Sequence, residues 1–166
     1  MSCRLCTATN KDGSACRNHT CERGNRCWIH LRSQKGLMVK KSGIPNAGRG
    51  LYATRPFKQN KTIVAYTGKH IASDDMWEHY PDGSDAAYAV GSPETYYVDA
   101  LNPQFSSVGR YINDCYSSNR RDNLCTNNAK VIRQGDYGKI KIKALKNINK
   151  GDEIFSDFSE YRYGEA

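Results

Sequence analysis

The first part of the chain concentrates residue types that bind metal ions. Cysteines stand at positions 3, 6, 16, 21 and 27, and a histidine follows the last of them by three residues. Thiolate and imidazole groups together hold Zn²⁺ in a tetrahedral site. The segment "CRLCTATNKDGSACRNHTCERGNRCWIH" has almost no hydrophobic residues, so burial of apolar surface cannot stabilise it. We therefore predict a zinc site whose metal supplies the folding free energy.

The zinc ligands that we predict are Cys6, Cys16, Cys27 and His30. Cys27 and His30 form a short knuckle, because two residues separate them. Gly13 lies in the turn "NKDGS", where it permits the chain to reverse between the first two ligands.

Further groups in the same segment leave the choice of ligands open. Cys3 forms a second chelating pair with Cys6, whereas Cys21 and His19 are surplus, and we expect the histidine to be exposed. Disulfides are the alternative staple, but the odd number of cysteines and the lack of an export-type apolar stretch favour zinc. We also expect Trp28 to pack beneath the metal.

Composition and charge bound what the whole chain can be. Its 166 residues fit one domain with a small appended module. No apolar run approaches the ~18 residues of a membrane span, so we expect no membrane partner. The first residues also lack the apolar stretch of a secretory signal, so we expect an intracellular protein. Residues 1–45 carry nine Lys/Arg against two Asp/Glu, and the remainder is nearly neutral. This basic segment favours contact with nucleic acid or chromatin, although a solvated basic face explains it equally well.

From Leu37 onward the sequence is typical of many short strands separated by turns. Isoleucines and lysines alternate over residues 139–143, which predicts a strand with one solvent-exposed face. Residues 73–80 predict one or two helical turns with Ser73 as the N-cap. We therefore predict a mostly-β domain over residues 34–166, preceded by a zinc-binding module over residues 1–33.

Four segments of the β domain occur in a characteristic order. They are "NAGRGLYAT" at 46–54, "VAYTG" at 64–68, "YYVDA…GRYINDC" at 96–115 and "ALKNINKGDEIFSDF" at 144–158. Their order and spacing resemble the SET domain of protein-lysine methyltransferases over essentially all of residues 37–163. The resemblance implies several small sheets of short strands with knot-like C-terminal packing. It also implies methyl transfer from S-adenosylmethionine to lysine in a histone or another lysine-rich protein, in the nucleus or on chromatin.

The resemblance also implies which residues contact the cofactor. Glycine lets the backbone at "GRG" pass close to a ligand, although an ordinary hairpin loop is the alternative for that segment. The implied contacts are Gly48, Arg49, Gly50, Leu51, Arg110, Asn113 and Asp114.

Lysine methylation requires a neutral amine, because only its lone pair attacks the sulfonium methyl group. Free lysine has a pKa of about 10.4, and a narrow aromatic channel favours deprotonation by desolvating the charged form. The resemblance places Tyr66 and Tyr96 in this channel. Strand tyrosines with hydrogen-bonded hydroxyls are the alternative interpretation.

Three positions depart from the family's pattern. Phe158 stands where the family has a catalytic tyrosine, so Tyr161 is the nearest substitute for the missing hydroxyl. Asp114 and Cys115 replace a usual histidine and serine, and we expect Cys115 and Cys125 to be buried free thiols. Loss of one preorganised polar group typically costs on the order of 10²–10³ in rate. The alternative function is therefore a catalytically weak or inactive SET-fold module that binds a peptide or chromatin.

The aromatic side chains that close the channel must also be supplied. In many SET proteins a cysteine-rich segment after the domain completes the channel, but no cysteine follows Cys125 here. We expect the closing rings to come from "EYRYGEA" at 160–166, or from a second subunit in a homodimer.

Overall fold

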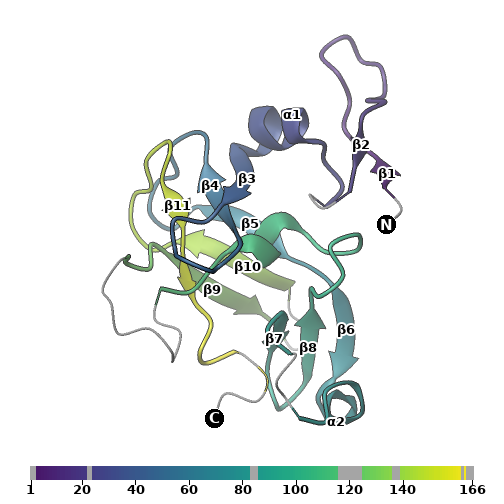
Figure 1. The fold of residues 1–166 in the computed structure, drawn as a ribbon, viewed down its shortest axis with the longest axis vertical. Coiled ribbons are helices and arrows are strands. Elements are labelled where there is room, and N and C mark those ends of the chain that lie inside the picture. The colour runs from purple at the N-terminus through teal and green to yellow at the C-terminus, as the bar shows by residue number, and fades with distance from the viewer. Residues whose placement is uncertain are drawn as a thin grey trace.

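In the computed structural model, short strands joined by irregular segments are the main regular secondary structure (Figure 1). In the described part of the chain the strands form four small sheets, which confirms the predicted mostly-β fold. The residues that the structure describes are 3–21, 24–82, 86–115, 125–135, 139–161 and 163.

The largest sheet has the order β12-β9-β10-β5, with β12 parallel to β9 and the other pairs antiparallel. The predicted alternating strand is β10, in which Ile140 and Ile142 are buried while the lysines are partly or fully exposed. The strands are β5 (Thr62–Tyr66), β9 (Ala129–Gln134), β10 (Lys139–Ala144) and β12 (Ser156–Asp157).

Two three-stranded antiparallel sheets accompany it. One has the order β11-β4-β3 and carries the "GRG" segment at the start of β4; the other has the order β6-β8-β7. Their strands are β3 (Leu37–Lys41), β4 (Arg49–Ala53), β11 (Glu153–Ile154), β6 (Lys69–Ala72), β7 (Ala89–Gly91) and β8 (Tyr96–Asp99).

Short helices connect the strands. The predicted turns at 73–80 are present as η2 (Ser73–Asp75) and α2 (Met76–His79). The predicted N-cap was wrong, because Ala72 occupies the cap position and the Ser73 hydroxyl donates instead to the carbonyl of Ser92, 2.8 Å away. A further 3₁₀ turn, η3 (Val108–Tyr111), begins the "GRYINDC" segment.

Strands of three sheets contribute to one main hydrophobic core: β3, β4, β5, β7, β8, β9, β10 and β11. Leu51 of β4 and Ile142 of β10 are 0% exposed. The C-terminal segment passes between two other parts of the chain, because Phe155 bridges Asn113 on one side while β12 pairs with β9 on the other. This threading places the C-terminal aromatic residues beside the "GRYINDC" segment.

The N-terminal module stands to one side of the sheets, and α1 joins it to β3 (Figure 1). Its secondary structure is β1 (Arg4–Leu5), β2 (His19–Thr20), α1 (Trp28–His30) and η1 (Leu31–Lys35). Gly36 ends η1 with φ +69°, a left-handed conformation that favours glycine. Among the described residues, no helix is both long and apolar enough to cross a membrane.

Candidate functional site

The four predicted zinc ligands lie together in the N-terminal module. The ligand atoms of Cys6, Cys16, Cys27 and His30 are within 4.8 Å of one another, and all four residues are buried. The imidazole Nδ1 of His30 lies 3.3 Å from the Cys27 sulfur and 3.7 Å from the Cys6 sulfur. A tetrahedral site with Zn–S bonds of about 2.3 Å separates its ligand atoms by about 3.8 Å. The donor set and its spacing therefore fit a zinc ion.

The electrostatics of the cluster favour a thiolate at Cys27. Burial raises the pKa of its thiol, but hydrogen bonds from His30, Cys6 and Asn18 outweigh burial and lower the pKa to about 6. The thiolate is the form that binds metal, so this sulfur is prepared for a cation at neutral pH.

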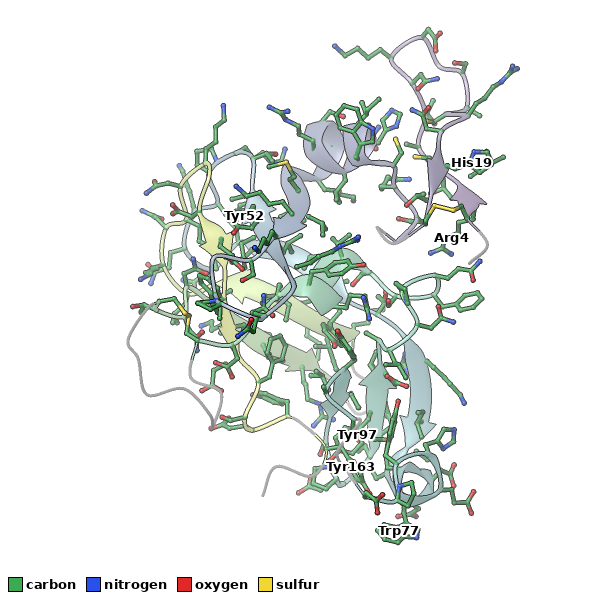
Figure 2. The ribbon with its side chains drawn as sticks, in the orientation of Figure 1. Arg4, His19, Tyr52, Trp77, Tyr97 and Tyr163 are labelled. Carbon is green, nitrogen blue, oxygen red and sulfur yellow. A yellow bond between two sulfur atoms is a disulfide. The ribbon has the colours of Figure 1, made fainter. Side chains whose placement is uncertain are left out.

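The remaining cysteines of the module are joined to each other. Cys3 and Cys21 form a disulfide between the chain segments of the β1–β2 hairpin, so Cys3 is not available for the alternative pair with Cys6 (Figure 2). His19 is exposed, as expected. The expectation for Trp28 was wrong: its side chain is 61% exposed, whereas His30 is the buried residue of α1.

A second site lies in the β domain, where a cleft of about 440 Å³ opens between separate segments of the chain. Four predicted cofactor residues and two predicted aromatic residues line this cleft. They are Gly48, Arg49, Arg110, Asn113, Tyr66 and Phe158.

The predicted cofactor residues of the cleft come from the "GRG" and "GRYINDC" segments. Gly48 has φ +69°, and a Cβ added there would face open space within 4 Å, so the backbone is exposed to a ligand. The side-chain amide of Asn113 donates to the Arg49 carbonyl over 3.0 Å and ties the two segments together. Arg110 donates from Nε to the Ala100 carbonyl over 2.8 Å, and its guanidinium lies 4.3 Å from the centre of the Tyr88 ring.

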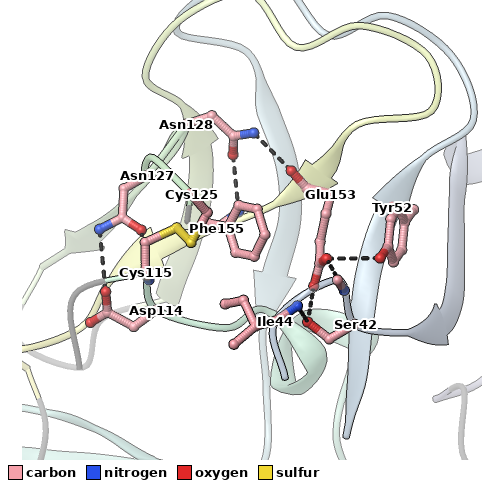
Figure 3. Close-up of a disulfide and its surroundings, with 11 residues drawn as sticks. Ser42, Ile44, Tyr52, Asp114, Cys115, Cys125, Asn127, Asn128, Glu153 and Phe155 are labelled. Carbon is pink, nitrogen blue, oxygen red and sulfur yellow. Dashed lines mark hydrogen bonds between the residues drawn. A yellow bond between two sulfur atoms is a disulfide. The ribbon is translucent and has the colours of Figure 1, made fainter. Parts of the chain in front are cut away.

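A buried carboxylate holds the loop that precedes Gly48. The side chain of Glu153 accepts hydrogen bonds from the Ser42 hydroxyl over 2.6 Å, the Gly43 amide over 2.8 Å and the Tyr52 hydroxyl over 2.8 Å (Figure 3). Burial, together with the Glu153 charge, raises the pKa of Tyr52 to about 12. Sequence reasoning missed this role of Glu153, although "GDE" had marked the segment as part of the family pattern.

The packing against Glu153 explains why Gly50 does not line the cleft. Its missing side chain leaves room for the Glu153 carboxylate, which a Cβ would contact. Leu51 points into the main core instead of toward the cleft. Asp114 is also buried, and its carboxylate accepts hydrogen bonds from the Asn127 amide and the Phe158 backbone amide, both over 3.3 Å.

Aromatic side chains also line the cleft. The Tyr66 and Phe158 rings are 6.0 Å apart between centroids and inclined by 53°. The Tyr66 hydroxyl donates to the Tyr88 carbonyl over 2.8 Å. Tyr88 and Tyr111 also line the cleft and were missed, because the short segments around them show no pattern beyond strand or core.

Tyr96 and Tyr161 are not among the residues that line the cleft. The Tyr96 ring stacks on His70 with centroids 5.0 Å apart. The backbone carbonyl of Tyr161 accepts from the Gly91 amide over 2.8 Å. Tyr163 packs edge-on against Tyr97 at 5.4 Å (Figure 2), while the other residues of the expected closing segment from 162 onward lie outside the described part.

Cys115 and Cys125 form a disulfide (Figure 3). The expectation that both are free thiols was therefore wrong. The chain returns toward Cys115 at this point, since the Asn127 side-chain carbonyl accepts from the Cys115 amide over 3.2 Å. Ile44 and Phe155 cover the pair.

Comparison with known families decides what this arrangement is. Residues 48–159 match the description "SET domain". The chain belongs to the SET-domain family. The matched range of this SET domain includes all six predicted residues that line the cleft, whereas the metal-ligand cluster precedes it.

Curated relatives of this SET-domain chain carry methyltransferase names. It is 29% identical over 131 residues to a histone-lysine N-methyltransferase, H3 lysine-4 specific, of Eremothecium gossypii, covering 76% of this chain and 12% of the relative. It is 24% identical over 156 residues to the histone-lysine N-methyltransferase EZH2 of Chaetomium thermophilum, covering 89% of this chain and 9% of the relative. The chain therefore spans only about a tenth of the length of these proteins.

Solved structures share the fold. An autoinhibited ctPRC2 bound to S-adenosylmethionine superposes with a TM-score of 0.60 at 18% identity, over 96% of this chain and 24% of the other. ATXR5 in complex with histone H3.1 mono-methylated on R26 gives a TM-score of 0.59 at 17% identity, over 78% and 59%. At these identities the likeness establishes the SET fold of this chain.

Proposed function

We propose that this SET-domain chain is an S-adenosylmethionine-dependent protein-lysine N-methyltransferase. The observation that carries the proposal is the cleft, which Gly48, Arg110 and Asn113 line together with Tyr66 and Phe158. The cleft thus combines exposed backbone and polar groups with aromatic rings. The methyltransferase names of the curated relatives support the same activity.

The cleft residues divide into a cofactor set and a lysine set. Gly48, Arg49 and Asn113 would hold S-adenosylmethionine, which supplies the methyl group when bound; the open space at Gly48 and the polar groups beside it fit such a ligand. Tyr66 and Phe158 would surround the lysine side chain. Their rings exclude water, which lowers the pKa of the amine and favours its neutral form.

In the N-terminal module, zinc has a structural role in this proposal. Three thiolates and one imidazole form a closed set of four ligands, which leaves no open coordination position for a substrate. The metal would supply folding free energy to the module, whose buried cluster contains only small side chains.

Histone is the substrate that we favour, and the nucleus or chromatin is the expected location. Curated relatives are named for histone H3 lysine 4, and a structural neighbour was solved with histone H3.1. The basic N-terminal residues are suited to a chromatin environment, where the dominant charge is negative.

Methyl transfer from labelled S-adenosylmethionine tests this function. We expect incorporation into recombinant histone H3 or another lysine-rich protein, with the modified residue located by mass spectrometry. At cofactor concentrations below saturation, an Asn113→Ala variant should incorporate less label, since it lacks the hydrogen bond to the Arg49 carbonyl. Absence of incorporation across the panel, together with undetectable cofactor binding by calorimetry, would overturn the proposal.

A second candidate function is a SET-fold module that binds its peptide and cofactor without efficient transfer. The observation in its favour is Phe158, which is 3% exposed and places a ring without a hydroxyl against Tyr66. The Phe158→Tyr variant separates the two functions. A large gain from near-zero transfer supports the binding module, whereas robust transfer by the unmodified protein removes it.

A further inference from the structure

A second groove, of about 620 Å³, lies where the N-terminal module meets the SET domain. Its lining comes from the N-terminal module, including η1, and from β5 and the segment that precedes η3 in the SET domain. It shares no lining residue with the active-site cleft. We refer to it as the basic groove, because four of its lining residues are cationic and, among the described residues that line it, none is acidic. The four cations are Arg4, Arg26, Lys35 and Arg55.

The arginines of the basic groove are held in place by contacts that use only part of each side chain. Arg4 donates from Nε to the Gly24 carbonyl over 3.3 Å, and Arg26 donates from Nη1 to the Thr7 hydroxyl over 2.7 Å. The Nε of Arg26 is enclosed and has no hydrogen-bond partner among the described residues.

Arg55 is fixed by packing. Its side chain lies directly over Gly36, where an added Cβ would come within 2.5 Å of the Arg55 Cγ. Its guanidinium lies 5.8 Å from the centre of the Phe57 ring. The charge is therefore positioned at the groove before any ligand arrives, which reduces the entropy lost on binding.

An exposed aromatic ring completes the groove. Phe105 lines it and is 65% exposed. The turn that carries Phe105 is built on Asn102, whose carbonyl accepts from the Phe105 amide over 3.2 Å and from the Ser106 hydroxyl over 2.8 Å. A Cβ on Gly24 would lie 3.1 Å from the Ser106 carbonyl oxygen, so the module packs closely against this turn.

We propose that the basic groove binds a single strand of nucleic acid, with phosphates on Arg4, Arg26, Lys35 and Arg55 and a base stacked on Phe105. Cations that track a backbone beside an exposed ring are the combination that binds single strands without sequence preference. An acidic polypeptide would engage the cations but would leave the aromatic face without a planar partner. The inference is independent of methyl transfer, because none of these residues lies in the cleft.

Fluorescence anisotropy with a labelled 12-nucleotide single-stranded DNA of mixed sequence tests the proposal, using the full chain loaded with zinc at 50 to 200 mM salt. The Arg4→Gln/Arg55→Gln double variant should weaken binding by about tenfold or more and reduce the salt slope by about 1.4, since two phosphate contacts are lost and each contributes about 0.7 on a single strand. Phe105→Ala should weaken binding by about fivefold or more with little change in slope.

The matched control is Lys146→Gln/Lys150→Gln, which removes two charges from exposed positions outside the groove and the cleft. It should leave the dissociation constant within about threefold of the unmodified protein, because charges that do not contact the strand are largely screened. An equal loss in the control pair would reduce the interaction to general charge attraction and overturn the groove.

Two further results would also contradict the proposal. If Phe105→Ala bound the DNA with unchanged affinity, a base would not stack on Phe105. Displacement of the DNA by a heptaglutamate peptide at equal concentration would assign the groove to acidic polypeptides. Zinc content and thermal unfolding establish that each variant is folded, and the single Arg4→Gln variant gives the same comparison if the double variant does not fold.

Discussion

The N-terminal module and the SET domain hold their folds by different means. The buried cluster of the module consists of Cys6, Ala8, Cys16 and Cys27, whose side chains are small and three of which end in sulfur. The SET domain buries large aliphatic side chains such as Ile142 between its sheets. In the proposed zinc-bound state, metal ligation replaces the apolar area that the short module lacks, whereas the longer domain has enough surface to bury.

The largest effect that separates the two regions is expected from Cys27→Ser. Serine is a poor zinc ligand, and structural zinc contributes about 10–16 kcal/mol of apparent binding free energy in small domains. We expect the variant to lose its metal and the fold of the module, while the SET domain keeps its own thermal transition. Metal analysis and far-ultraviolet circular dichroism measure the two outcomes.

Cys3→Ser is the control for the metal-ligand variant, because Cys3 pairs with Cys21 outside the ligand cluster. It should retain zinc and lose only the disulfide contribution, typically about 2–4 kcal/mol. If both regions unfolded together in Cys27→Ser, the separation between metal-held and core-held folds would be wrong.

The converse change is Ile142→Ala in the core of the SET domain. Ile142 is 0% exposed, so truncation leaves a cavity and should lower the free energy of unfolding by about 2–5 kcal/mol. Zinc content should not change. Urea denaturation measures the loss, and Ile142→Val, which should cost about 0.5–1.5 kcal/mol, is the graded control. At some urea concentrations only the SET domain of the Ala variant unfolds. If this variant also released its zinc there, the module would depend on this core.

A smaller effect is expected from Glu153→Gln, which keeps the shape of the side chain that holds the 42–48 loop. The amide has one acceptor oxygen in place of two, so one donor among Ser42, Gly43 and Tyr52 faces an N–H group. We expect the affinity for S-adenosylmethionine, measured by calorimetry, to fall by about tenfold, because hydrogen bonds to charged groups are worth about 1.5–3 kcal/mol. Glu160→Gln, at an exposed position, should have no effect; an equal loss there would contradict a specific role for Glu153.

The smallest expected effect is a dependence of stability on alkaline pH that comes from Tyr52. Its pKa is raised from 10.0 to about 12 in the folded protein, so folding favours the protonated phenol. This contribution to stability is fully present below pH 10 and is lost as the pH rises through about 12. In Tyr52→Phe the free energy of unfolding should fall less steeply over this window. Identical pH profiles for the two proteins would contradict the buried Tyr52–Glu153 contact.

Residue types and their order predicted several groups that the structure brings together. The resemblance carried by the "GRG" and "GRYINDC" segments led to Gly48, Arg110 and Asn113, which line one cleft, and the cysteine spacing led to the cluster of Cys6, Cys16, Cys27 and His30. Groups that act through distant contacts were not predictable in this way. Glu153 meets Ser42 across 111 positions of sequence, and no local pattern encodes such a contact.

The disulfides show the same limit. Cys3 with Cys21 and Cys115 with Cys125 are brought together by the path of the chain, which residue types alone do not define. Gly50 and Leu51 show a second limit, because the motif assigns a whole segment to a ligand, whereas in the structure Gly50 packs against Glu153 and Leu51 lies in the core.

Calorimetric titration of the zinc-loaded protein with S-adenosylmethionine tests whether the cleft at Gly48 holds the methyl donor. We expect saturable binding to one site, with the affinity reduced by about tenfold in Asn113→Ala, which loses a hydrogen bond to the Arg49 carbonyl. Asn147→Ala, on an exposed loop outside the cleft, should bind as the unmodified protein does. No binding by the unmodified protein, or the same loss in both variants, would contradict it.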